Sequence, residues 1–412
     1  MKTNLFKLLS FSVFYLLVLN LSAQTWTQKA NFPGGTREYV AGFTIGHYGF
    51  IGLGHNGATT YNDFYEWNQT NNTWKGIANY PGSGRYSAVA CAIEGKAYVG
   101  MGYTGSNAVT DFWMYDTTSN TWVSKATFPG TKRYDAAWFV LGHKLYVIGG
   151  SDGGTPYLSD DWVYDAHANT WKALSGSPTT STDGMVCFAI GNHGYVGGGW
   201  NGTSAQTACY EYDSTTDSWT SIVSFPVPIG GDARTFVLGS KAYVCTGSNN
   251  TNTLSAGYVY DTATKAWAEF TNMGGNGIER GYAAAFTIGN YGYIGAGRDS
   301  LGGDLTDFWQ YTPCDTGSPT AVNIITEIQN VAVKVYPNPS NGVFYLSYNG
   351  LNDKQGQVRI MDMFGRVVKS YDIEGREGIM KMDESILSNG MYFYQVISSD
   401  IIISTGKFLI NK

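Results

Sequence analysis

Cysteine, histidine and basic residues are all scarce in this 412-residue chain, and each shortage argues against a class of protein. The five cysteines are odd in number, scattered and without CxxC spacing, which argues against a disulfide framework and against a zinc site. Cys91, Cys187 and Cys245 lie in apolar segments and are interpreted as small buried residues. The net charge is −6, so the basic stripe of a nucleic-acid-binding protein is missing.

Long apolar segments are also rare. The one candidate is the N-terminus, where Lys2 and Lys7 precede an apolar stretch over Leu8–Leu21 that ends at Ser22-Ala23. This pattern is typical of a secretory signal peptide over residues 1–23, because the apolar stretch is short for a membrane-spanning helix. We therefore expect an exported chain without a transmembrane segment.

The chain does contain a long-period repeat. Tryptophan recurs at intervals of 48 or 49 residues, at Trp26, Trp74, Trp122, Trp171, Trp219 and Trp267. Within each period an aromatic and β-branched strand pattern has a glycine four residues after its aromatic residue, at Gly54, Gly102, Gly150, Gly199, Gly247 and Gly297. Each period reads as four short strands, and four strands per period of about 50 residues are typical of propeller blades.

Strand counting indicates how the ring closes. Five periods contain all four strands in order, whereas the sixth ends after Asp307–Tyr311 with no tryptophan-bearing strand behind it. The segment around Trp26 at the start of the mature chain supplies the missing strand. We predict a six-bladed ring that is latched by its first strand, which removes an exposed sheet edge.

Over residues 24–313 these features resemble the kelch repeats of galactose-oxidase-like propellers. The resemblance implies an all-β fold, a six-bladed kelch-type β-propeller. The diglycine of that repeat is complete only at Gly149-Gly150 and within Gly197–Gly199. The family includes oxidases, sialic-acid mutarotases and plain interaction modules, so the resemblance leaves the function open.

The repeat stops at Cys314, and residues 314–324 have the composition of a linker. Residues 325–412 show short alternating strand patterns, which predict a small C-terminal β-sandwich. Four motifs stand there in order, Val335–Pro339, Met363–Val368, Leu387–Tyr392 and Thr405–Ile410. They resemble the type A C-terminal sorting domain of the type IX secretion system of Bacteroidota. This resemblance implies partnership with that machinery and a final location outside the cell or on its surface.

The five histidines do not converge on one point. His47, His143 and His193 fall in turns on three different blades, and His167 falls in another turn on the same face. Only His55 lies in a loop on the other face. We therefore expect no metal and no cofactor, and no copper-oxidase activity in spite of the superfamily resemblance.

Arginine recurs where the innermost strand begins. It stands thirteen positions before the aromatic residue of the second strand in four blades and is followed by a tyrosine, giving Arg37, Arg85, Arg133 and Arg280 with Tyr39, Tyr86, Tyr134 and Tyr282. The same slot holds Thr182 and Gly230 in blades 4 and 5, where Asp183 and Asp232 follow. We predict that these arginines, tyrosines and aspartates ring the channel mouth and bind a carboxylate-bearing or polyhydroxy ligand. The alternative is that each arginine is scaffold, bonded to loop carbonyls or to a neighbouring acid.

Two classes of function compete. The favoured one is a binding module for a glycan or protein. The other is a sugar-active enzyme resembling the kelch-type sialic-acid mutarotases, in which an acid–base pair beside an arginine opens the sugar ring. The candidate acids near the mouth are Glu38, Asp135, Asp183 and Glu279, and the sequence singles out none of them as catalytic. Pairing of every mouth acid with an arginine would weaken the enzyme hypothesis.

Overall fold

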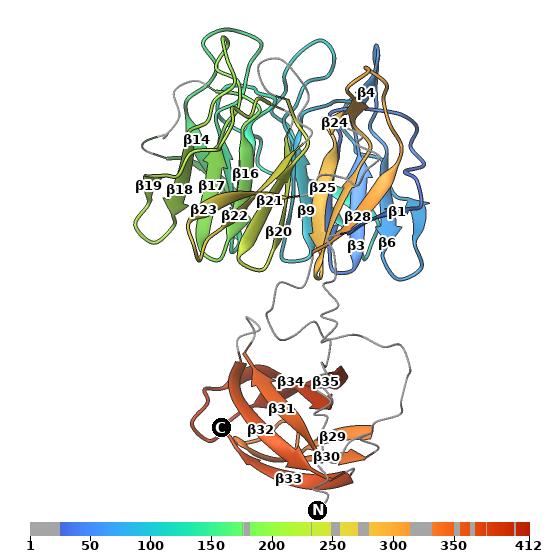
Figure 1. Cartoon of the computed structure of the whole chain (residues 1–412), viewed down its shortest axis with the longest axis vertical. Coiled ribbons are helices and arrows are strands. Elements are labelled where there is room, and N and C mark those ends of the chain that lie inside the picture. The colour runs from blue at the N-terminus through green and yellow to red at the C-terminus, as the bar shows by residue number, and fades with distance from the viewer. Residues whose placement is uncertain are drawn as a thin grey trace, which may run out of the picture. The chain divides into compact units, whose positions relative to one another are not determined.

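The computed structural model describes residues 25–174, 176, 182–231, 233–248, 256–270, 280–313, 332–349, 355–362, 367–375, 377–398 and 401–412. The chain divides into two compact units, Met1–Cys314 and Asp315–Lys412 (Figure 1). All regular elements of the described residues are strands. Within those residues no helix could cross a membrane. The predicted signal peptide and the 314–324 linker lie outside the described residues.

The described part of the first unit forms six four-stranded antiparallel sheets. Blade 1 comprises β2 (Ala41–Ile45), β3 (Tyr48–Gly52), β6 (Phe64–Asn68) and β7 (Thr73–Gly76). Blade 2 comprises β8 (Val89–Ile93), β9 (Lys96–Gly100), β10 (Phe112–Asp116) and β11 (Thr121–Ser124). Blade 3 comprises β12 (Ala137–Leu141), β13 (Lys144–Ile148), β14 (Asp161–Asp165) and β15 (Thr170–Ala173).

Blades 4 to 6 repeat the order, with one exchange in the last. Blade 4 comprises β16 (Val186–Ile190), β17 (His193–Gly197), β18 (Cys209–Asp213) and β19 (Ser218–Ile222). Blade 5 comprises β20 (Arg234–Leu238), β21 (Lys241–Cys245), β22 (Gly257–Asp261) and β23 (Ala266–Phe270). Blade 6 comprises β25 (Ala284–Ile288), β26 (Tyr291–Gly295) and β28 (Phe308–Thr312), with β1 (Thr25–Lys29) as its outer strand. Two short pairs accompany the blades, β4 (His55–Asn56) with β5 (Thr59–Thr60) and β24 (Arg280–Gly281) with β27 (Arg298–Asp299).

The innermost strands form a closed ring. Strand β2 contacts β8, β8 contacts β12, and the series continues through β16, β20 and β25 back to β2. In Figure 1 the orange strands of blade 6 lie beside the blue strands of blade 1. These six strands surround a central cavity of about 490 Å³. The predicted six-bladed propeller is therefore the observed fold.

The first strand completes the last blade, as the sequence predicts. Strand β1 pairs antiparallel with β28, placing Trp26 opposite Tyr311. The indole of Trp26 packs on Tyr311 at 5.1 Å between ring centroids and reaches Phe236 of blade 5 at 6.2 Å. Ring closure therefore depends on hydrogen bonds and packing between the two ends of the propeller sequence.

The periodic tryptophans join neighbouring blades. In four of them the indole Nε1–H donates to the backbone carbonyl of the residue four positions after the preceding blade's tryptophan: Trp74 to Ala30 (2.7 Å), Trp122 to Ala78 (2.9 Å), Trp171 to Ala126 (2.9 Å) and Trp267 to Val223 (3.0 Å). These four indoles are partly buried, and their N–H groups find an acceptor in the neighbouring blade, so the repeat encodes packing and hydrogen bonding together.

The glycine after each second strand is required by close backbone approach. At Gly54, with φ of 88°, an added Cβ would lie 2.6 Å from the carbonyl oxygen of Glu38. The same approach recurs at Gly102, where the oxygen of Tyr86 is 2.7 Å away. A side chain at these positions would push the loop before the first strand away from the blade.

Three of the cysteines, Cys91, Cys209 and Cys245, are buried, whereas Cys187 is only partly buried and lines the central cavity. The buried assignment is therefore wrong for Cys187.

The second unit packs a three-stranded sheet and a four-stranded sheet around a shared apolar core that includes Phe344, Val358 and Phe408. Its strands are β29 (Ala332–Tyr336), β30 (Val343–Asn349), β31 (Gln355–Met361), β32 (Val367–Glu374), β33 (Glu377–Asp383), β34 (Gly390–Ser398) and β35 (Ile401–Ile410).

Candidate functional site

The channel has one end where the inner strands begin, and we call this end the mouth. The residue two positions after the arginine slot has a left-handed backbone in five blades: Tyr39 (φ 53°), Ser87 (53°), Asp135 (50°), Gly184 (60°) and Tyr282 (59°). We call these five residues the collar. Backbone amides connect part of it around the ring, from Ser87 to Tyr39 (3.2 Å), Asp135 to Ser87 (3.3 Å) and Gly184 to Asp135 (2.9 Å).

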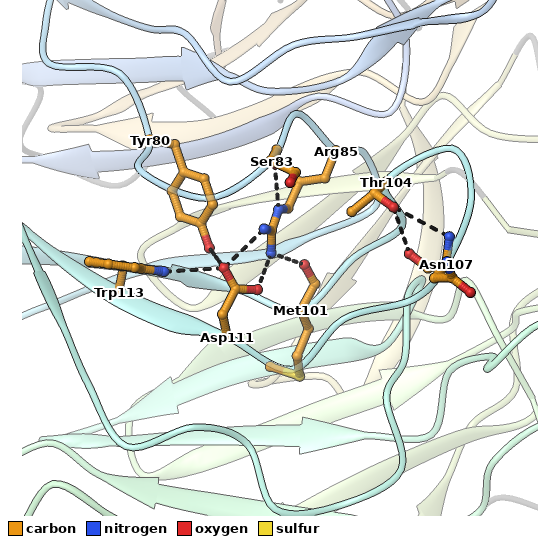
Figure 2. Close-up of polar contacts among 8 residues, drawn as sticks. All are labelled: Tyr80, Ser83, Arg85, Met101, Thr104, Asn107, Asp111 and Trp113. Carbon is orange, nitrogen blue, oxygen red and sulfur yellow. Dashed lines mark hydrogen bonds and ion pairs between the residues drawn. The ribbon is translucent and has the colours of Figure 1, made fainter.

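The four repeated arginines do not line the mouth. Arg37, Arg85, Arg133 and Arg280 are between 0 and 2% exposed. Figure 2 shows Arg85, which donates from Nη1 and Nη2 to the two carboxylate oxygens of Asp111 at 2.5 and 2.9 Å. Its Nη1 also donates to the carbonyl of Met101 (3.0 Å), at the end of the second strand. The phenol of Tyr80 and the indole of Trp113 donate to the same carboxylate.

The other three arginines repeat this geometry. Each pairs with an aspartate that precedes the third strand: Arg37 with Asp63 (2.5 Å), Arg133 with Asp160 (2.8 Å) and Arg280 with Asp307 (2.7 Å). Each also donates to the carbonyl of Leu53, Gly149 or Ala296 respectively. The prediction that these guanidinium groups bind ligand at the mouth is wrong, because the groups are buried and their Nη donors bond to carboxylates and carbonyls inside the blade, which holds its loops together.

Aromatic side chains occupy the mouth instead. An arc of six partly exposed rings runs across blades 6, 1, 2 and 3, consisting of Tyr282, Tyr39, His55, Tyr86, Tyr103 and Tyr134. Neighbouring centroids lie 3.9 Å (Tyr282 to Tyr39), 5.5 Å (Tyr39 to His55), 4.3 Å (His55 to Tyr86), 5.5 Å (Tyr86 to Tyr103) and 5.1 Å (Tyr103 to Tyr134) apart. We call this set the aromatic arc.

Two acids lie beside the end of the arc. Burial and, to a smaller extent, the nearby charge of Asp135 raise the pKa of Asp183 to about 7. Burial also raises the pKa of Asp135, against the opposing effects of a hydrogen bond with Ser87 and of the charge of Arg234. Within the described part of the chain, neither carboxyl group has a cationic side chain within 4 Å. Asp135 and Arg234 both line the central cavity.

A second group of charges lies across blades 1 and 6. The buried carboxyl of Glu38 accepts a hydrogen bond from Arg298 Nη1 at 2.8 Å and lies 3.5 Å from His55. Burial raises the pKa of Glu38, although the charge of Arg298 opposes the shift. Burial also raises the pKa of the neighbouring Asp304. Glu38 is therefore ion-paired, whereas neither Asp135 nor Asp183 makes an ion pair with any described residue.

Several mouth residues escaped sequence analysis. His55, Tyr103, Ser151, Trp200 and Arg298 each stand five positions after the aromatic residue of the second strand, and each pairs through its backbone with the residue after the arginine slot. A comparison of blades at that spacing would have found them. Arg234 occurs in blade 5 only, so a comparison between blades would not have found it.

The remaining positions predicted at the mouth add little to the description of the site. Thr182 is buried and Gly230 hydrogen-bonds to Ser248 through its backbone. Asp232 and Glu279 lie outside the described residues. Among the residues that the structure does describe, no cluster of three or more His, Cys, Asp or Glu side chains could hold a metal ion.

Comparisons with known proteins agree with this architecture. Residues 124–297 match the KLHDC2/KLHL20/DRC7 Kelch-repeats domain and residues 84–129 match the Kelch motif. Residues 334–411 match the secretion system C-terminal sorting domain. The chain belongs to the kelch-repeat propellers and carries a C-terminal sorting domain.

A solved structure titled "Structure of YjhT" superposes on this kelch protein with a TM-score of 0.60 at 16% identity, covering 69% of this chain and 97% of that one. At this identity the likeness shows the fold alone. No curated protein sequence matches the chain. The propeller and the sorting domain together make this a secreted kelch protein.

Proposed function

We propose that the kelch propeller is a binding module that holds a glycan at the mouth of its channel. The aromatic arc supports this proposal most directly, since partly exposed tyrosine rings offer both a flat apolar face and a hydroxyl group. Carboxyl groups and a cavity lie next to the rings, which is the usual composition of a site for a polar small ligand. Presentation of such a site outside the cell agrees with the sorting domain.

Substitution of an arc tyrosine tests the proposal. Tyr103→Ala removes a ring that packs against Tyr86 and Tyr134, and we expect about a tenfold loss of glycan affinity, or about 1.4 kcal/mol. Glycan-array screening of the full chain identifies the ligand, and isothermal titration then measures the change. Tyr291→Ala is the matched control, because Tyr291 is also exposed but lies in the turn region at the opposite end of its strand pair. Equal losses in both variants would contradict the proposal.

A second candidate function is supported by Asp183. A carboxyl group with a pKa of about 7 beside a second acid can act as a general acid or base near neutral pH. Under this alternative, the propeller speeds the ring opening of a reducing sugar. NMR exchange between anomers would detect the activity, and Asp183→Asn should remove it while leaving the thermal midpoint unchanged. No acceleration by the unaltered chain for any sugar that it binds would exclude the enzyme.

A further inference from the structure

Among the described residues at the mouth, two acids and one cation remain outside ion pairs. The four repeated arginines are buried and matched by four aspartates. Arg298 forms an ion pair with Glu38, and the charge of Asp304 also interacts favourably with it. Arg234 donates from Nε and Nη1 to the carbonyls of Ala283 and Ala233 and makes no ion pair within the described ranges. Among the described residues, Asp135 and Asp183 make no ion pair, although the charge of Arg234 acts on Asp135 at longer range.

Aromatic rings and acids share the same space. The pKa of Tyr86 is raised by burial and also by the charges of Asp135 and Glu38, so this ring lies within electrostatic range of both. Burial raises the pKa of Tyr157, and the charges of Asp183 and Asp135 add to the shift. Rings with electron-rich faces attract organic cations, and the attraction grows when a carboxylate lies nearby.

The cavity wall adds a polar group beside Asp135. The hydroxyl of Ser87, a collar residue, is buried from solvent and interacts with the carboxyl group of Asp135, where it lowers the pKa against the effect of burial. It lines the same cavity as Asp135, so a ligand with a polar head could reach both.

From this arrangement we infer that the ligand carries an ammonium group, held between Asp135, Asp183 and the rings of the aromatic arc. The inference deepens the proposed function and rests on it, since it gives the glycan an unacetylated amino sugar. Of the two ligands expected from the sequence, carboxylate-bearing or polyhydroxy, it disfavours the first, because the arginines on which that expectation depended are occupied within the blades.

A pair of saccharides that differ only at nitrogen provides the test. The tetramer of β-1,4-linked glucosamine carries primary ammonium groups, and its fully N-acetylated form carries neutral amides. We expect the full chain to bind the free-amine tetramer at least about tenfold more tightly at pH 7.5 in isothermal titration. Asp183→Asn and Asp135→Asn should each remove most of that preference. Glu269→Gln, which removes an exposed charge on the outer strand β23, is the matched control.

The pH dependence gives an independent readout. Tetramethylammonium keeps its charge at every pH, so any change in its binding comes from the protein. Asp183 ionises as the pH rises through about 7, and affinity for this probe should increase over the same range. The described groups that interact with Asp183 or Asp135 include Tyr86, Tyr157, Ser87 and Arg234, and none of these titrates near neutrality at its ordinary pKa. Because His55 of the aromatic arc also has a titratable ring, the pH series is repeated with His55→Gln.

The outcomes separate the two proposals. Equal binding of both tetramers, with no effect of either aspartate substitution, would overturn the ammonium inference and leave the glycan function standing. Binding of tetramethylammonium or of a lysine-rich peptide without binding of any saccharide would support the inference and overturn the glycan function. Binding of Ca²⁺ that depends on both aspartates and displaces tetramethylammonium would assign the site to a metal. Absence of binding by every probe at millimolar concentration would overturn both.

Discussion

Asp307→Ala is expected to lower the free energy of unfolding by about 3–5 kcal/mol, because it leaves the guanidinium of Arg280 buried without a counter-charge. Arg280 is 0% exposed and donates to both carboxylate oxygens at 2.7 Å, while the Asp307 side chain is only 14% exposed. Chemical denaturation of the full chain, followed by tryptophan fluorescence, measures the loss.

The companion variants define what the loss means. In the double variant Arg280→Met with Asp307→Leu, no buried charge remains, so its stability should lie much closer to that of the unaltered protein. Asp160→Ala should cost less than Asp307→Ala, since the Asp160 side chain is 43% exposed and water can reach its place. A loss below about 1 kcal/mol for Asp307→Ala would show that the pair does not stabilise the blade.

The same pair has a consequence for pH. Burial by itself would raise the pKa of Asp307, but the hydrogen bonds and charge of Arg280 outweigh it and hold the pKa below its ordinary value. Asp111 and Asp160 behave alike beside their own arginines. A lowered folded-state pKa means that the stabilisation is complete above the unfolded pKa of about 4 and is lost as the pH falls through the folded value. Acid should therefore loosen the propeller at several blades together.

Deletion of residues 24–29 is expected to cause the second large effect, a loss of more than about 4 kcal/mol. The deletion removes the five-residue ladder between β1 and β28 together with the packing of Trp26 on Tyr311 and Phe236. It also exposes the edge of β28, which favours association between chains. The thermal midpoint and the oligomeric state of the truncated chain, produced without its first 29 residues, are the measurements.

A synthetic peptide gives this prediction a specific control. A peptide with the sequence of residues 24–30 can add to the open edge of β28 and should raise the midpoint of the truncated chain. A scrambled peptide of the same composition should not. If the truncated chain already melts at the midpoint of the complete chain, the first strand does not hold the ring closed.

Most of the propeller could be predicted from the sequence because several independent sequence patterns indicate the same six blades. The tryptophan spacing and the glycine after each second strand each indicate a blade, and they agree with each other. The absence of a tryptophan strand after Tyr311 also located the closing strand correctly at Trp26. Redundancy of this kind is what makes repeat architectures readable without a structure.

The arginine prediction was wrong for a reason that the sequence also contained. The four blades with an arginine have an aspartate four positions before the aromatic residue of the third strand, namely Asp63, Asp111, Asp160 and Asp307. The two blades without the arginine have Ala208 and Ala256 at that position. Two charges that appear and disappear together within one chain indicate a pair. Position alone placed the arginine backbone near the mouth but could not give the direction of its side chain.

The pKa values of the acids at the mouth could not be predicted from the sequence. Asp135 and Asp183 were named as candidates, but their raised pKa values depend on burial and on the distance between them. Neither quantity can be read from residue spacing. The aromatic arc likewise joins residues from four blades through contacts that only the closed ring creates.

The collar offers a route to redesigned specificity. Its backbone course is set by amide-to-carbonyl bonds between successive blades, so the side chains of Tyr39, Ser87 and Asp135 project from a frame that does not depend on their identity. A combinatorial library at these positions should therefore retain a folded ring while its selectivity for small molecules changes. Valine, isoleucine and threonine should be depleted from the surviving clones, because a β-branched side chain tolerates a left-handed backbone poorly.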